Sequence, residues 1–585
     1  MPYSVNGNKM ISLVFTRFIF YAWHDKAYSR QKGMKKMVQK WYQQAIIYQI
    51  YPRSFQDTNG DGIGDLPGIY RRLPYIKQLG ANTIWLNPIF VSPQVDHGYD
   101  VANYFAIDPV FGTMADFERL VTRCHELKLR LLLDLPLNHT SDQHPWFQDA
   151  SQNVNSIYRD YYIWAIGTNG RPNNWGSFFG GSVWAASPLQ KDAYYFHAFD
   201  AHMPDLNWAN PEVRKAMADV AKFWLAKGVA GFRLDAFIHI AKADFNQNNL
   251  QPSSQQYPLA AAFYENLPAV RPYLADFITQ VKQAYPDTFF LGEAASANAT
   301  QAAAYTQTAT DCDVVMTAKN YGEYYPNYDS QIPEFFQPRQ LSLRQLKRTF
   351  KHWETVLKWP VLSWGTHDVS RVLDRLQLPK DKPAVAKALA LLMYLQKGLP
   401  VIYYGEEIGL HNLQFGQVAD FKDQRGQALI RQLRQQQYPE ATLLTLLNQY
   451  DEMTARGPFP WSTQRYGGFS TQQPWNWGQV PAENLASQWE KSTSVVQFYR
   501  QVLALKQQPL FRAGTYQLLA TTETIYAYKR RHQGKIALVV VNFSPSPAQF
   551  SLLKQHYRTV LATGAQVAAQ QVQLSAWGGI VLITE

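Results

Sequence analysis

Short apolar segments recur along residues 45–404, and stretches with helical spacing of apolar positions separate them. Each segment is rich in β-branched or aromatic side chains and is bounded by polar residues, a pattern typical of buried strands. Strands that alternate with helices indicate a parallel sheet, so eight such units predict an α/β fold, a (β/α)8 TIM barrel. The predicted strands are 45–51, 83–89, 129–135, 231–236, 288–293, 313–317, 361–364 and 401–404.

The pattern changes in two places outside these strands. Residues 141–203 are rich in Asn, Gly, Trp and Tyr and too numerous for an ordinary loop, so they predict an inserted subdomain B over the barrel mouth. Short alternating strands such as 525–529 and 536–542 predict a C-terminal antiparallel β-sandwich over residues 508–585. The predicted barrel then comprises residues 37–140 and 204–507.

The first 36 residues differ in charge from the rest of the chain. They contain seven Lys or Arg and one acid, so +6 of the formal net charge of +11 lies there. An apolar stretch at 11–23 is interrupted by Arg17 and is too short to span a bilayer. We interpret residues 1–36 as an extension that is disordered or not native, with the native start near Met34 or Met37; a signal peptide is the alternative.

Composition excludes several classes of protein. The remaining residues carry only +5 and contain no run of Lys or Arg that would follow phosphates, which argues against a nucleic-acid partner. The two cysteines, Cys124 and Cys312, exclude a disulfide framework and favour a cytoplasmic protein with free thiols. The glutamine-rich tract 428–437 predicts an exposed helix without a chemical role. We therefore expect an enzyme of ordinary composition with no membrane partner.

Charged side chains follow the ends of four predicted strands, in the motifs DLPLNH, GFRLDA, FLGEA and SWGTHD. The carboxyl ends of barrel strands meet at one mouth, where the functional residues of this fold concentrate. Any one of these residues alone would be explained by a buried ion pair, but six residues in four ordered motifs indicate a sugar-cleaving site. They are Asp235, Glu293, Asp368, Arg233, His139 and His367.

In spacing and order, these motifs resemble the α-amylase superfamily of retaining α-glycosidases over roughly residues 40–585. The resemblance implies Asp235 as nucleophile, Glu293 as acid/base and Asp368 on the 2- and 3-hydroxyls of the sugar. Arg233 would hold Asp235 ionised, and Glu293 would need a less solvated position to carry its proton. His139 and His367 would bind further hydroxyls.

Further residues match positions that bind the terminal sugar in exo-acting members of the superfamily. In VDHGYD, Asp96 matches an acid on the 4-hydroxyl and Tyr99 an aromatic platform under the ring. ARGPFPW resembles the family motif ARTPMQW, in which Arg456 matches the arginine that pairs with that acid. An Asp96–Arg456 pair would close the pocket beyond one glucose and predicts exo-action; the alternative is an arginine on a surface loop.

The loop DTNGDGIGD has oxygen-bearing residues at alternate positions, as hard cations prefer. It starts like an EF-hand, but Gly68 stands where that motif has Glu, so it resembles instead the calcium loop of oligosaccharide-cleaving α-glucosidases. We expect a structural Ca²⁺; the alternative is an Asx-rich turn without metal. The expected ligands are Asp57, Asn59, Asp61, Asp65 and the carbonyl oxygen of Ile63.

The type of glycosidic linkage that is cut depends on residues close to the nucleophile in the sequence. In the α-glucosidase branch, valine after the nucleophile accompanies α-1,6 linkages and a smaller residue accompanies α-1,4, so Ala236 favours α-1,4. MPDLN lies between the motifs of the oligo-1,6-glucosidase and neopullulanase branches, and the N-terminal carbohydrate-binding domain of the latter is missing. The leading interpretation is a cytoplasmic α-glucosidase acting on short α-glucan oligosaccharides.

Three alternatives remain open at this point. Oligo-1,6-glucosidase or neopullulanase-type specificity would use the same acids on another linkage. A glucosyl-transferring relative, such as a sucrose isomerase or trehalose synthase, would differ in how well the pocket excludes water. From another class, inactive transporter-subunit ectodomains carry a membrane helix and have lost catalytic acids, whereas this chain retains all three acids and has no adequate span.

Overall fold

The computed structural model describes residues 40–167, 170–251, 253, 255–317, 322–379, 382–479, 483–552 and 555–585. The chain forms two compact units, Met1–Gln44 and Ala45–Glu585. In the first unit, the described residues include a short 3-10 helix, η1 (Trp41–Gln44). The extension expected over residues 1–36 lies outside the described residues.

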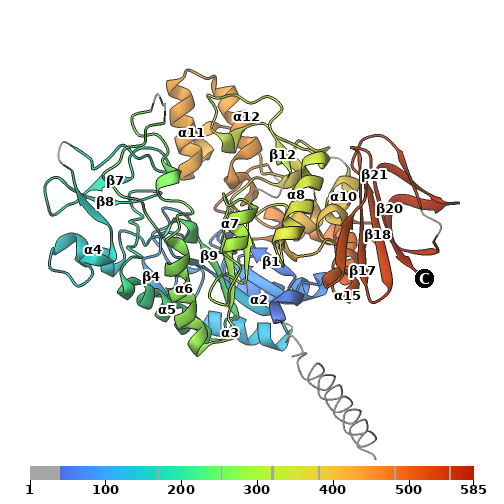
Figure 1. Ribbon diagram of the computed structural model, residues 1–585, viewed down its shortest axis with the longest axis horizontal. Helices are drawn as coiled ribbons and strands as arrows, with labels where there is room; N and C mark the ends of the chain where they lie inside the picture. The colour runs from blue at the N-terminus through green and yellow to red at the C-terminus, as the bar shows by residue number, and fades with distance from the viewer. Residues whose placement is uncertain are drawn as a thin grey trace, which may run out of the picture. The chain divides into compact units, whose positions relative to one another are not determined.

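The second unit is built on an eight-stranded parallel sheet, ordered β11-β10-β9-β5-β2-β1-β15-β14 (Figure 1). Its end strands, β11 and β14, also contact each other, so the sheet curves into a nearly closed barrel. Each of the eight predicted segments overlaps one of these strands, which confirms the predicted fold class. They are β1 (Ile47–Ile50), β2 (Thr83–Leu86), β5 (Arg130–Pro136), β9 (Gly231–Asp235), β10 (Phe289–Glu293), β11 (Val314–Met316), β14 (Val361–Leu362) and β15 (Leu399–Tyr403).

Amphipathic helices pack around these strands. Thr113 and Asp116 form a reciprocal capping box at the start of α3, and Asn210 caps α5, so local sequence sets where these helices begin. Their buried apolar faces join one large core with the strands. The longer helices are α2 (Leu66–Leu79), α3 (Met114–Glu126), α5 (Pro211–Ala226), α6 (Val270–Ala284), α8 (Leu343–Val356), α10 (Pro383–Met393) and α14 (Val495–Lys506); the shorter ones are α7 (Ala299–Ala304), α9 (Val372–Arg375) and α13 (Leu485–Trp489).

A small lobe follows β5. It contains α4 (Pro145–Gln152) and a three-stranded antiparallel sheet ordered β6-β8-β7. Its own aromatic core includes Trp175 and Trp184 and also takes Tyr264 from the segment after β9. The lobe therefore places aromatic side chains from two connections beside the barrel mouth. The strands are β6 (Trp164–Ile166), β7 (Trp184–Ala186) and β8 (Ala193–Phe196), and β3 (Phe90–Val91) pairs with β4 (Asn103–Ile107) nearby.

A second lobe follows β15 and is formed by α11 (Gln424–Gln435) and α12 (Glu440–Tyr450). Leu429, Ile430 and Leu433 are buried in a separate apolar cluster with residues of α12. The exposed helix predicted over 428–437 is therefore half of a packed pair, and its first turn carries Arg425, which faces the central cavity.

The C-terminal region is an antiparallel sheet that encloses its own apolar cluster. The last strand pairs with β19 through its first residues and with β18 through its later ones, so one continuous sheet folds over itself. Strands were correctly predicted at 525–529 and 536–542. The elements are α15 (Pro509–Arg512), β16 (Thr515–Leu518), β17 (Ile525–His532), β18 (Lys535–Asn542), β19 (Ala548–Ser551), β20 (Tyr557–Ala568) and β21 (Gln571–Thr584).

The remaining elements are short. Two-stranded pairing joins β12 (Glu323–Tyr324) and β13 (Gln340–Leu341). The 3-10 helices are η2 (Pro52–Ser54), η3 (Arg159–Tyr161), η4 (Phe237–His239), η5 (Ala261–Phe263), η7 (Glu334–Phe336), η8 (Glu406–Ile408), η9 (Val418–Asp420), η10 (Glu452–Ala455) and η11 (Arg465–Gly468). No helix in the described ranges combines the length and apolar character needed to cross a membrane.

Candidate active site

A cavity of about 870 Å³ lies at the carboxyl ends of the barrel strands. β9 ends at Asp235, β10 ends at Glu293, and Asp368 follows β14, so the barrel topology alone brings the three acids together. His139 follows β5 and also lines the cavity, as do Arg233, Asp96, Tyr99 and Arg456. His367 is fully buried beside this wall rather than part of it.

Arg233 is the centre of the carboxylate cluster. Its Nη1 lies 2.5 Å from Asp235 Oδ1 and 2.8 Å from Asp134 Oδ1. Its Nη2 lies 2.9 Å from Glu293 Oε1 and 3.9 Å from Asp368 Oδ2. One buried guanidinium therefore holds the two carboxylates expected to react, on its two terminal nitrogens.

The acids differ in environment. Burial raises the pKa of Asp235 well above its ordinary range, and the Arg233 cation opposes this shift. Burial also acts against ionisation of Asp368, yet His367, Arg233 and Arg456 hold the pKa of Asp368 below its ordinary value. The side chain of Glu293 is 23% exposed and that of Asp235 is 11% exposed, so Glu293 does not occupy the less solvated position that we expected.

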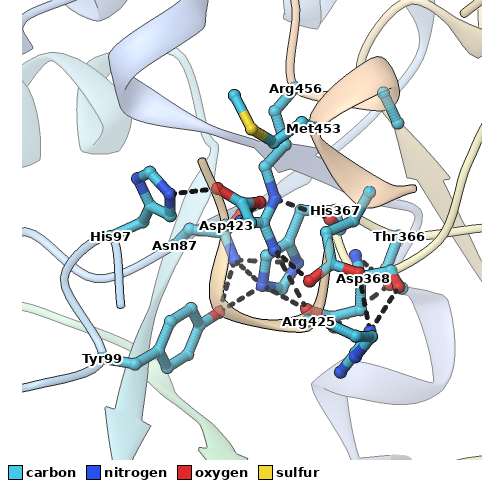
Figure 2. Close-up of polar contacts among 12 residues, drawn as sticks. Asn87, His97, Tyr99, Thr366, His367, Asp368, Asp423, Arg425, Met453 and Arg456 are labelled. Carbon is cyan, nitrogen blue, oxygen red and sulfur yellow. Dashed lines mark hydrogen bonds and ion pairs between the residues drawn. The ribbon is translucent and has the colours of Figure 1, made fainter. Parts of the chain in front are cut away.

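A buried hydrogen-bond network fixes the floor of the pocket (Figure 2). His367 stacks on Tyr99, with ring centroids 5.5 Å apart, and its Nε2 lies 2.5 Å from the Tyr99 hydroxyl. That hydroxyl donates to Asp134 Oδ2 at 2.9 Å, and Asn87 Nδ2 donates to the hydroxyl oxygen at 2.8 Å. Gln49 Nε2 donates to His367 Nδ1 at 2.8 Å. These contacts place Tyr99 and His367 as a rigid pair.

At the closed end of the pocket, no direct ion pair joins Asp96 to Arg456 among the described residues, although the Arg456 cation opposes the burial that raises the pKa of Asp96 to about 7. Arg456 Nη1 instead binds Asp423 Oδ2 at 3.0 Å, and its Nη2 lies 3.7 Å from Glu452 Oε1 and 3.8 Å from Asp368 Oδ1. His97 Nε2 binds the other oxygen of Asp423 at 2.6 Å. Asp423, which precedes α11, thus lies between Arg456 and His97, as Figure 2 shows.

His139 and Ala236 both line the cavity that holds Asp235. His139 Nε2 is buried and has no hydrogen-bond partner among the described residues, although it belongs to the cavity wall. Burial lowers the pKa of His139 to about 4, so its ring is neutral near pH 7. The backbone N–H of Ala236 donates to Glu293 Oε2 at 3.2 Å. With respect to the described residues, His139 therefore has a free ring nitrogen at the cavity, and Ala236 helps to hold the Glu293 carboxyl group.

The predicted metal loop is ordered by its own backbone. Asp57 accepts N–H groups from Asn59, Gly60 and Gly62, and Asp61 accepts that of Ile63. Asp65 caps α2 by accepting from Gly68 N at 2.6 Å. Within the described ranges, no group of three or more His, Cys, Asp or Glu side chains converges as metal ligands do. A cation here would rely on neutral oxygens as well, from the Asn59 amide and the Ile63 carbonyl.

Several cavity residues were missed in the sequence. Phe178, Phe199 and His239 form an aromatic wall, with the rings of Phe178 and Phe199 5.2 Å apart and nearly parallel. They come from the inserted lobe and the segment after β9, where no motif marks them. Asp134 is different, because it opens the DLPLNH motif and could have been found as the partner of Arg233.

A parallel barrel whose mouth presents carboxylates around an arginine defines the class: this is a glycoside hydrolase. The chain belongs to the α-amylase family, since the family model for the α-amylase catalytic domain matches residues 49–514. An oligo-1,6-glucosidase of Halalkalibacterium halodurans is 35% identical over 521 residues, covering 87% of this chain and 91% of the relative. A trehalose-6-phosphate hydrolase of Bacillus subtilis is 34% identical, covering 89% and 92%.

Solved structures agree with this assignment. A structure described as a family GH13_31 enzyme has a TM-score of 0.85 and 43% identity, covering 94% of this chain and 100% of its own. A trehalulose synthase, MutB, has a TM-score of 0.85 and 32% identity, covering 93% and 100%. The relatives share the fold and differ in the reactions for which they are named.

Proposed function

We propose that this protein is a retaining α-glucosidase that removes terminal α-linked glucose from short oligosaccharides. The observation that carries the proposal is the Arg233 guanidinium, which binds Asp235 and Glu293 on separate nitrogens at the cavity wall. Two carboxyl groups on either side of one glycosidic bond are what double displacement needs. Relatives named oligo-1,6-glucosidase support an oligosaccharide substrate.

In the first step, Asp235 attacks the anomeric carbon while the carboxylic proton of Glu293 passes to the glycosidic oxygen. The bond between that oxygen and the anomeric carbon breaks, and a glucosyl ester on Asp235 forms. In the second step, Glu293 takes a proton from water, whose oxygen attacks the same carbon and frees Asp235. Arg233 stabilises the carboxylates throughout, and Asp368 and His139 would bind hydroxyls of the reacting sugar.

We propose that the enzyme prefers α-1,4 to α-1,6 glucosidic linkages and that it cleaves α-glucans from the chain end. The proposed linkage preference rests on Ala236, which lines the cavity beside the proposed nucleophile and leaves room for the leaving sugar. The names of several relatives favour α-1,6 instead. Exo-action rests on Asp96, Arg456 and Glu452, which line the cavity, and on Asp423, which is buried and binds Arg456. Long α-glucans should release glucose singly, and early release of mixed oligosaccharides would contradict this.

The deciding experiment is a product assay on maltose, isomaltose, sucrose and trehalose, with the released anomer followed by proton NMR. Retention requires that α-glucose appears before mutarotation; β-glucose first would overturn the mechanism. Trehalulose synthase neighbours support a second candidate, transfer of glucose within sucrose. Isomerised disaccharide rather than free glucose from sucrose would favour that candidate.

We also propose a structural Ca²⁺ in the loop of Asp57, Asn59, Asp61, Ile63 and Asp65. The carboxylate and amide side chains and the Ile63 carbonyl supply the hard oxygen donors that Ca²⁺ prefers. A cytoplasmic location is proposed as well, supported by two buried cysteines that are free thiols. Elemental analysis tests the first proposal, and fractionation of the source cells tests the second.

A further inference from the structure

Two arginines reach the closed end of the cavity, and they differ in how many donors remain available. Arg456 is nearly buried, with 5% of its side chain exposed. Its Nε donates to the His367 carbonyl at 2.9 Å, its Nη1 donates to Asp423 at 3.0 Å, and its Nη2 faces two carboxylates. Arg456 therefore organises the wall and has little left to offer a ligand.

Arg425, unlike Arg456, keeps donor groups available to a ligand. Its side chain is 33% exposed and belongs to the cavity wall. Its Nη1 donates to Glu452 Oε2 at 2.7 Å and lies 3.4 Å from the Asp368 carbonyl oxygen. Its Nε and Nη2 have no hydrogen-bond partner in the part of the chain that the structure describes. Two charged donor groups thus remain available at the site.

The orientation of Arg425 is fixed from two sides. Glu452 is buried between Arg425 and Arg456 and anchors one terminal nitrogen of Arg425. The guanidinium carbon lies 4.3 Å from the centre of the Phe335 ring, which sets the plane of the group. A preorganised guanidinium loses little conformational entropy when it binds a ligand. This rigidity distinguishes Arg425 from an ordinary surface arginine.

Neighbouring charges place Arg425 near the sugar-binding acids. Burial works against its charge, but the carboxylates of Glu452, Asp368 and Asp96 raise the pKa of Arg425 above its ordinary value. Asp368 and Asp96 are the two acids expected on the hydroxyls of the terminal glucose. Arg425 Nη1 lies 3.4 Å from the Asp368 carbonyl oxygen, as Figure 2 illustrates, and Arg425 lines the same cavity as Asp368 and Asp96, so it lies beside the place expected for that sugar.

We propose that Arg425, rather than Arg456, donates hydrogen bonds to the 3- or 4-hydroxyl of the terminal glucose and determines recognition of that sugar. This inference rests on the proposed α-glucosidase function. A hydroxyl that leaves water needs a new partner, and a bond from a charged donor is stronger than one from a neutral donor. Arg456 then acts as a positioning residue, holding Asp423 and Asp368.

The test compares an aryl α-glucoside with its 3-deoxy and 4-deoxy analogues, by kcat/KM, in the wild type and in Arg425→Ala. Loss of a charged hydrogen bond should lower kcat/KM for the parent by about 10- to 100-fold. The wild type should lose a similar factor on one deoxy analogue. In Arg425→Ala, kcat/KM for that deoxy analogue should lie within about threefold of kcat/KM for the parent, because the partner of the missing hydroxyl is already gone.

Arg434→Ala is the matched control. Arg434 lies on the same helix and pairs with Glu440 at 2.7 Å, with 53% of its side chain exposed. Its removal should leave kcat/KM and both deoxy penalties within about twofold, as expected for a surface ion pair. If Arg425→Ala does not fold, judged by its melting midpoint, Arg425→Gln is measured in its place.

Equal deoxy penalties in the wild type and in the Arg425 variant would overturn the inference, because a purely structural role leaves substrate discrimination unchanged. If the deoxy penalty instead disappears in Arg456→Ala, Arg456 is the residue that donates to that hydroxyl. A wild-type protein that does not hydrolyse the parent glucoside would overturn the proposed function itself, and this inference with it.

Discussion

The backbone N–H of Ala236 donates to Glu293 Oε2, 3.2 Å away. The residue after the proposed nucleophile thus holds the proposed acid/base, so the two reacting carboxyl groups are coupled through the main chain as well as through Arg233. Ala236 has φ = 50°, in the left-handed region that most residues avoid. The turn that directs this amide towards Glu293 is therefore part of the site.

Asp235→Asn should abolish hydrolysis while the protein remains folded, since the amide keeps the shape but cannot attack. Loss of a covalent nucleophile costs several orders of magnitude in kcat. The measurement is kcat on maltotriose together with the melting midpoint. A folded variant that keeps more than about 1% of the activity would be inconsistent with the assignment.

Glu293→Gln should impair hydrolysis of substrates with poor leaving groups far more than that of activated aryl glucosides. An amide cannot protonate the leaving oxygen, but a good leaving group does not need that proton. Comparing kcat/KM for maltose and for a nitrophenyl glucoside checks this. An equal loss on both substrates would argue against Glu293 as the acid.

Ala236→Val should shift the preference from maltotriose towards isomaltotriose. Two added methyl groups beside the nucleophile crowd the leaving sugar of an α-1,4 bond, an effect worth about 1–3 kcal/mol, or roughly tens-fold in kcat/KM. A β-branched residue in the left-handed region also adds strain, so the melting midpoint should fall. A wild-type enzyme that already prefers isomaltotriose would refute the role given to Ala236.

Added Ca²⁺ should raise the melting midpoint, and a chelator should lower it, because a ligand that binds only the native state stabilises it. Asp61→Asn, which removes one proposed ligand charge at an exposed position, should weaken the response without altering kcat. Should neither calcium nor chelator move the midpoint, and elemental analysis find no metal, the loop is a turn only.

Four buried histidines should each make the protein less stable as the pH falls below about 6.5, while buried carboxyls such as Asp96 and Glu406, whose pKa burial raises to about 7, contribute in the opposite direction. Burial lowers the pKa of His139 to about 4 and those of His144, His239 and His367 to about 3. At these four histidines the native state therefore binds fewer protons than the unfolded chain, whose histidines titrate near 6.5, and their contribution to stability falls as the pH drops.

Each histidine lowers the free energy of unfolding by about 2 kcal/mol between pH 7 and pH 5. Denaturant melts at pH 7, 6 and 5 measure it. His144→Phe should reduce the slope with pH, because it removes one of the four groups while keeping an aromatic ring beside Tyr104 and Trp146. His352→Gln, at an exposed position on α8, is the control. If the wild type and His144→Phe change in unfolding free energy by the same amount between pH 7 and pH 5, the prediction is contradicted.

The sequence by itself determined the barrel and the three acids at its mouth. Strand formation depends on local apolar runs, and strands of a parallel barrel present their carboxyl ends at one mouth, so Asp235, Glu293 and Asp368 could be placed together before any coordinates. Arg233 could be paired with Asp235 because side chains two apart on a strand point the same way.

Only the tertiary structure decided what surrounds those acids. Asp423 precedes α11, Arg425 lies in its first turn and Glu452 follows α12, so their contacts with Arg456 and Asp368 depend on the packing of this helix pair. Loop backbones have no fixed periodicity that a sequence pattern could reveal. The expected Asp96–Arg456 pair therefore gave way to Asp423, because the partner of a buried charge is chosen by three-dimensional proximity and not by spacing along the chain.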